Sequence, residues 1–191
     1  MNLKKNKSLT ITLILLVLCC FFGFNKQTQP EIIIWNKNRL LNWNDFKAQP
    51  ENNCIDAAMT SSGVTMNWKT KRDSAFVTVV AFMNPQDSWV ISNERTNALL
   101  KHEQLHFDIS ELHARKLRQN ILLQKLNKKD LANVLKSLVG NSHKLRKQSQ
   151  NQYDLEIRQN KSKQLEWEKK VALELKSLEQ YSNTEIRVLL K

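Results

Sequence analysis

The residues of this chain best suited to chemistry are His102, Glu103 and His106, which form an HExxH sequence. Residues four apart in a helix lie one turn apart on one face, so the two imidazoles are spaced to bind one metal ion. Neutral imidazole nitrogens suit zinc, which lowers the pKa of a bound water molecule towards about 7. Glu103, beside the histidines, would accept the proton of that water. The pattern therefore predicts a hydrolytic zinc site on a helix.

Such a site needs a third protein ligand. His113 lies seven residues after His106, roughly 10 Å farther along a continuous helix, and is too far away to reach the same ion. His143 lies in a stretch rich in lysine and arginine, so an acidic residue of a later helix is the better candidate. A bare HExxH also arises by chance, in which case the histidines are ordinary surface residues.

The second half of the chain has the composition of helices. Residues 94–191 contain one glycine and no proline, with many Leu, Lys, Glu and Gln. Capping residues at 92–95 predict a long first helix that ends near Leu122 and buries a stripe of apolar residues. Further helices are predicted at 129–139, where Gly140 would end the segment, at 142–159 and at 162–178.

The first half of the mature chain, residues 30–93, is rich in strand formers and turn residues. Strands are predicted at 31–35, 64–68, 74–82 and 88–92. Strands followed by helices indicate an α+β domain: a small antiparallel N-terminal sheet and a C-terminal helical half that carries HExxH on its first long helix. The strand at 88–92 is the expected edge with which an extended peptide would pair.

The first 24 residues have the pattern of a secretory signal peptide. Three lysines precede an apolar run at 9–24 that is shorter than the roughly 20 residues of a membrane-spanning helix. The sequence therefore predicts export, to the periplasm or out of the cell, with residues 25–191 as a single domain. One alternative is an uncleaved membrane anchor. A second and less favoured alternative is a lipid on Cys19, because the preceding Leu18 is larger than the residue that lipid-attachment sites prefer at that position.

The formal net charge is +12, of which +9 remains without the three signal-peptide lysines. Export argues against a nucleic-acid partner, and basic residues spread along helices among Gln and Asn are typical of a solvated face. Contact with anionic surfaces of the envelope is an alternative. Cys54 is the one cysteine after cleavage, so no internal disulfide can form, and we expect it to be buried. We expect a monomer that acts on a peptide or protein.

Four motifs, in order along the chain, carry a family resemblance: 41–46 (LNWNDF), 57–63 (AAMTSSG), 88–90 (SWV) and 99–109 (LLKHEQLHFDI). They resemble the L-x-W-x-D-F, A-x-T-x-x-G, S-W-V and L-L-x-H-E-Q-x-H-F-D-I segments of a bacterial domain of unknown function described as predicted secreted zinc-dependent proteases. The resemblance spans about residues 41–167. It implies a zincin-like fold and a bound Zn²⁺, with His102 and His106 as ligands and Glu103 as the catalytic residue.

One part of the family pattern is changed. The later family motif Y-D-x-x-T-x-H-G supplies a histidine that the resemblance implies as the third ligand, whereas residues 153–160 read YDLEIRQN. Gln159 stands at that position, and an amide oxygen is a weak zinc ligand. Glu156, one turn earlier, is the expected replacement and would complete a His₂Glu set. Asp154 and Gln159 itself are the alternatives.

Asp108 and Glu111 are expected to accept hydrogen bonds from the ligand imidazoles, although Glu111 could instead pair with Arg115, four residues later. Together these features predict an exported zinc-dependent hydrolase, namely a peptidase. The alternative is a catalytically inactive protease-like domain that binds a peptide or an envelope partner, and the substitution at Gln159 favours it.

Overall fold

The computed structural model describes residues 31–50, 52 and 54–191. The predicted signal peptide, residues 1–24, lies outside these ranges. Within them, no helix combines the length and the apolar composition that crossing a membrane requires. The described chain is an α+β protein with a small antiparallel sheet, as predicted, and it has three α-helices where the sequence predicted four.

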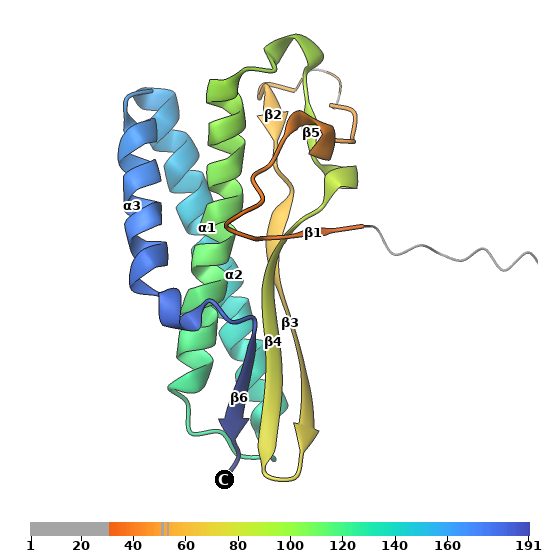
Figure 1. Cartoon of the computed structure of the whole chain (residues 1–191), viewed down its shortest axis with the longest axis vertical. Helices are drawn as coiled ribbons and strands as arrows, with labels where there is room; N and C mark the ends of the chain where they lie inside the picture. Colours follow the sequence, from red (N-terminus) through yellow and green to blue (C-terminus); the bar gives the residue numbers. More distant parts are fainter. Residues whose placement is uncertain (1–30, 51, 53) are drawn as a thin grey trace, which may run out of the picture.

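The main sheet is built around β4 (Ser74–Met83), which pairs with β3 (Ser62–Lys71) along its whole length. On its other edge, β4 pairs with β1 (Ile33–Ile34) at one end and with β6 (Glu185–Leu189) at the other (Figure 1). Every second side chain of β4, from Ala75 to Met83, is at most 1% exposed. This alternation is the pattern of a strand with one face against the core. The sequence patterns did not predict β6.

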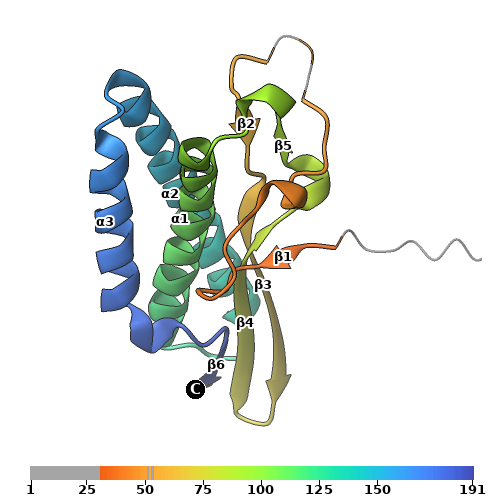
Figure 2. The ribbon, with the colours of Figure 1, turned by 45° about the horizontal axis from the view of Figure 1, so that its top comes forward.

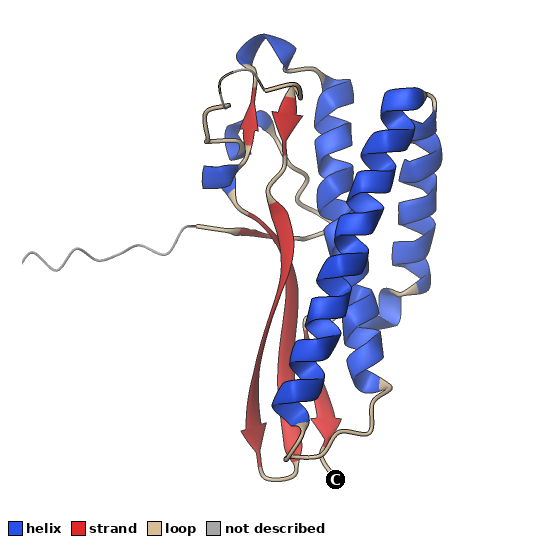
Figure 3. Ribbon diagram, turned by 180° about the vertical axis from the view of Figure 1, so that it is seen from behind, coloured by secondary structure: helices blue, strands red, loops and turns tan. Residues whose placement is uncertain are grey.

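Three helices, α1 (Asn97–Leu122), α2 (Leu131–Gln159) and α3 (Lys163–Ser177), lie on the same side of the sheet (Figures 1 and 3). Thr96 begins α1, because its hydroxyl accepts a hydrogen bond from the Leu99 amide at 3.1 Å. Short 3-10 helices lie at 43–45, 85–87, 92–94 and 179–181.

The predicted helix break near Gly140 is wrong, because α2 continues through this residue as one helix. A glycine inside a helix costs only about 1 kcal/mol relative to alanine. Tertiary packing offsets that cost, since Leu135 on one side of the glycine and Tyr153 on the other are both fully buried.

Helix α1 is buried on two sides, which holds its backbone in place. On the sheet side, Phe107, Leu117 and Ile121 belong to the main core with the buried residues of β4. On the other side, Leu105 and Ile109 pack in a second cluster with residues of α2 and α3, namely Tyr153, Trp167 and Val171. The helix predicted to carry the site is therefore the central element of the fold.

A two-stranded sheet lies near the N-terminal end of α1, where β2 (Ala58–Met59) pairs with β5 (Trp89–Val90) (Figure 2). The expected edge strand at 88–92 is therefore shorter than predicted, and it is not a free edge. Both β5 residues are buried, and Trp89 also bridges to Ala48 on the side away from β2. Cys54, on the segment leading to β2, is partly exposed, whereas we expected it to be buried.

Candidate metal centre

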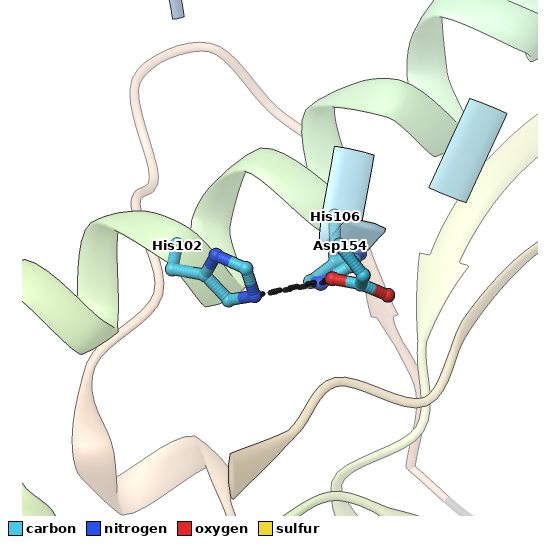
Figure 4. A group of neighbouring side chains, drawn as sticks. All are labelled: His102, His106 and Asp154. Carbon is cyan, nitrogen blue, oxygen red and sulfur yellow. Dashed lines mark hydrogen bonds and ion pairs between the residues drawn. The ribbon is translucent and has the colours of Figure 1, made fainter. Parts of the chain in front are cut away.

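Three side chains that could hold a metal ion converge between α1 and α2 (Figure 4). His102 Nε2 lies 3.1 Å from His106 Nε2, and Asp154 Oδ1 lies 3.3 Å and 2.9 Å from these two atoms. Tetrahedral zinc with ligand bonds of about 2.0–2.1 Å requires ligand atoms about 3.3 Å apart. The separations of the three donor atoms are close to this value, so the group can hold a metal ion.

Asp154, and not the expected Glu156, is the acidic residue that joins the histidines. The Glu156 carboxylate instead accepts hydrogen bonds from Trp167 Nε1 and Gln152 Nε2, both at 2.8 Å, and these bonds lower its pKa. Gln159 is exposed at the last turn of α2. Two residues along a helix are about 200° of rotation, so Asp154 and Glu156 point in nearly opposite directions. Only Asp154 is turned towards α1.

Gln150 orients His106 from the neighbouring helix. Its Oε1 is hydrogen-bonded to His106 Nδ1, and its Nε2 donates to the His106 carbonyl oxygen at 2.8 Å. Because an amide oxygen only accepts, His106 carries a proton on Nδ1. Nε2 is then the ring nitrogen that could bind a metal ion, after it loses the proton that it shares with Asp154. The sequence patterns did not predict a role for Gln150. The available signal was its position four residues before Asp154, on the same helical face.

Tyr153 packs against both imidazoles. Its ring stacks on His102 with centroids 4.7 Å apart and meets His106 edge-on at 5.0 Å. The side chain is fully buried, and its hydroxyl donates to Gln164 Oε1 at 2.5 Å. Tyr153 therefore limits rotation of the two rings and places Asp154, the next residue, opposite them.

Glu103 is held from the β2 side of the site. It is only 2% exposed, and its Oε2 accepts a hydrogen bond from Thr60 Oγ1 at 2.7 Å. Thr60 belongs to the motif at 57–63, so the structure brings this motif into contact with HExxH. The carboxylate is thereby fixed beside the two histidines, as a general base requires.

The carboxylates near His106 favour a positive charge on its imidazole. Burial alone would lower the pKa of His106, but its hydrogen bond to Asp154 and the nearby Glu103 carboxylate raise it above its usual value. Burial alone would raise the pKa of Asp154, but hydrogen bonds from His102 and His106 hold it well below its usual range. The carboxylate thus stays ionised and available to a cation.

His102, His106 and Asp154 line a cleft of about 660 Å³. Glu103 and Gln150 line this cleft together with the three donor residues. On the β2 side it is lined by five consecutive residues, 56–60. A strand that turned one face to the cleft would contribute every second residue, so the cleft is bordered by the edge of this segment.

Asp108 and Glu111 do not support the imidazoles, contrary to expectation. Asp108 accepts hydrogen bonds from Trp35 Nε1 at 2.7 Å and from Gln104 Nε2 at 2.8 Å, and burial raises its pKa. Glu111 binds Arg115, the alternative partner, with Oε1 3.0 Å from Nε. Both positions point away from the histidines because the 3.6-residue repeat carries residues 106, 108 and 111 to different faces.

The other two histidines are outside the group, as expected. His113 is buried and hydrogen-bonds Ser149 Oγ at 2.9 Å. His143 Nε2 donates to the Val64 carbonyl oxygen at 2.9 Å. Both histidines therefore serve contacts between elements of the fold.

No family model, curated protein or solved structure matches this chain. The resemblance to the secreted zinc-protease family therefore stays a prediction from the sequence motifs, and the functional argument depends on the geometry of the site.

Proposed function

We propose that this protein is an exported zinc-dependent peptidase with a zincin-like arrangement of helix and cleft. The observation that carries the proposal is the convergence of His102 Nε2, His106 Nε2 and Asp154 Oδ1 at separations that suit a tetrahedral ion. Asp154 takes the place of the histidine that the family motif would supply five residues later. The ligand set is then two imidazoles and one carboxylate, which is a common zinc set.

The residues of the site have different roles. His102, His106 and Asp154 hold the ion, and Gln150 keeps His106 in the tautomer that presents Nε2. The chemistry that Zn²⁺ supplies when bound is Lewis-acid activation of water and of the peptide carbonyl group. Glu103 accepts the proton of the attacking water and passes it to the leaving amine. Thr60 keeps the Glu103 carboxylate in place during both transfers.

The shape of the cleft suits an extended peptide. The edge of residues 56–60 lies across the cleft from the histidines and offers main-chain groups for pairing. This segment takes the role that was predicted for the strand at 88–92. Since β5 is paired on one side with β2 and bridged on the other, β2 is the strand next to the cleft.

The first test is the zinc content of the purified protein by elemental analysis. We expect about one zinc per chain and its loss in His106→Ala. The matched control is His143→Ala, which removes a histidine outside the group and should keep the metal. Absence of zinc after supplementation with Zn²⁺ would overturn the proposal and leave a protease-like domain that binds a peptide or an envelope partner.

The second test separates catalysis from metal binding. Glu103→Gln keeps the three donors and should retain zinc, yet it should hydrolyse an unfolded protein substrate about 10²–10⁴-fold more slowly than the wild type. Zinc binding without hydrolysis by the wild-type protein would contradict the peptidase proposal and favour the inactive binding domain.

Export is tested at the N-terminus. We expect the protein in the periplasmic or extracellular fraction, beginning near residue 25 by mass spectrometry. An intact N-terminus in the membrane fraction would instead support the anchor.

A further inference from the structure

Arg146 lines the same cleft as the metal group but has no role in the chemistry described above. It lies four residues before Gln150 and eight before Asp154 on α2. Residues at four-residue intervals share a helical face, so the three side chains form a row along the cleft. One helix thus presents a metal ligand, the residue that orients a ligand, and a guanidinium.

The guanidinium of Arg146 lacks an anionic partner within the described part of the chain. Its Nε is buried and makes no hydrogen bond, and burial lowers the pKa of the side chain. Arg158 also lines the cleft, but it has an anionic partner, since its Nη2 lies 3.4 Å from Asp56 Oδ1. A partly buried cation without a hydrogen-bond acceptor costs free energy. Because the buried Nε is closed to a ligand, an acceptor in the cleft would be bound by the terminal nitrogens of the guanidinium.

The acidic side chains of the cleft are already engaged by other partners. Glu103 is held by Thr60, Asp154 by the two histidines, and Asp56 by Arg158. The complementary group for Arg146 must therefore come with the ligand. A planar guanidinium matches a carboxylate best, because it can donate two parallel hydrogen bonds to it.

We propose that Arg146 binds a carboxylate of the peptide substrate and so determines which peptides the cleft accepts. This inference rests on the proposed peptidase function. Eight residues of α2 separate Arg146 from Asp154, which is about 12 Å along the helix axis. An extended peptide rises about 3.3 Å per residue. The carboxylate therefore belongs about three or four residues from the bond that is cleaved.

Two sources supply this chemistry: a Glu or Asp side chain, and the C-terminal carboxylate of the peptide. The probes are octapeptides of alanine and serine with both ends blocked, each carrying one Glu or one Gln at a scanned position. A parallel set has a free C-terminal acid in place of the amide. Preference for Glu at one position in the blocked set identifies a side chain, and preference for the free acid identifies the C-terminus.

The test measures binding and hydrolysis of these peptides by the full zinc-loaded protein. For the wild type we expect at least about a tenfold preference for the peptide with the matching carboxylate, as for other charge-assisted hydrogen bonds. Arg146→Gln should reduce this preference ratio to near one, and Arg146→Lys should keep part of it. Lys147→Gln is the matched control, because it removes the same charge from the neighbouring exposed position and should not change the ratio.

The outcomes separate this inference from the proposed function. Hydrolysis by the wild type with no carboxylate preference, or with a preference that Arg146→Gln retains, overturns the role of Arg146 and leaves the peptidase in place. Carboxylate-dependent binding that needs Arg146 but is not followed by hydrolysis supports the inference and overturns the peptidase. Thermal unfolding followed by circular dichroism confirms that each variant is folded.

Discussion

Two groups of polar side chains lie along α1, and they are built in opposite ways. The metal group consists of His102, His106 and Asp154. The ion cluster, two to four turns farther along, consists of Glu111, Arg115 and Arg118, with Glu179 at its edge. Both join α1 to other elements, the first to α2 and the second to the segment that leads into β6.

The two groups differ in how their charges are satisfied. In the ion cluster, the Glu111 carboxylate receives hydrogen bonds from both arginines, and the arginines also donate to the carbonyl oxygens of Leu175, Tyr181 and Val79. In the metal group, three acceptor-capable atoms face one another and a cleft opens beside them. A closed cluster of complementary charges is typical of a structural element. Convergent acceptors at a cleft indicate a binding site for a cation.

The largest expected effect tests the structural side of this comparison. Glu111→Gln would leave Arg118, which is fully buried, without its anionic partner. The free energy of unfolding should fall by about 3–5 kcal/mol, measured by urea unfolding. Glu174→Gln is the control, because it removes a carboxylate from a more exposed pair with Lys116 and should change little. Equal effects of the two substitutions would contradict a structural role for the ion cluster.

The next effect tests the metal group and the assignment of its third ligand. Asp154→Asn should weaken zinc binding by more than about 100-fold, because the loss of a direct ligand exceeds the effect of removing a supporting hydrogen bond. Glu156→Gln should leave the affinity unchanged, since its carboxylate binds Trp167. Competition with a chelator of known affinity measures both. Loss of binding in Glu156→Gln alone would restore the ligand expected from the sequence.

A smaller effect is expected at the residue that orients His106. Gln150→Ala removes the acceptor from His106 Nδ1 and should weaken zinc binding by about 10–100-fold. Gln152→Ala, on an exposed position of the same helix, is the control and should bind zinc as the wild type does. The same chelator competition applies, and an unchanged affinity in Gln150→Ala would remove this residue from the site.

The smallest effect concerns His113, another buried polar side chain of α1. Burial, with smaller contributions from Lys116 and Arg146, lowers the pKa of His113 to about 4 from 6.5. As the pH falls, His113 therefore binds a proton in the unfolded chain before it does so in the folded protein. The free energy of unfolding should be highest above pH 6.5 and should decrease as the pH falls towards 4. The loss should be on the order of 2 kcal/mol. Urea unfolding of metal-free wild type and His113→Gln at pH 7.5 and 4.5 measures it, and identical pH dependence in both would refute it.

Local patterns predicted those parts of the fold that depend on nearby residues. Helix α1 begins within a few residues of the predicted start because Thr96 and its neighbours can cap it, and β4 was predicted because its apolar residues form a long run of strand formers. Gly140 misled the prediction, since packing at distant positions keeps α2 continuous. Strand β6 lies far from β4 in sequence, and its Ile186 and Val188 face the core only after that pairing.

The candidate site also has one part that local patterns predicted and one part that depends on tertiary packing. The spacing of His102, Glu103 and His106 is a property of one helix, so residue type and the 3.6-residue repeat were sufficient to predict it. The third donor depends on how α2 is rotated against α1, and a change of two residues turns a side chain to the opposite face. That rotation is set by the burial of Tyr153 against the histidines and α3. The packing of α2 against α1, which no local pattern reveals, is what brings Asp154 and not Glu156 to the histidines.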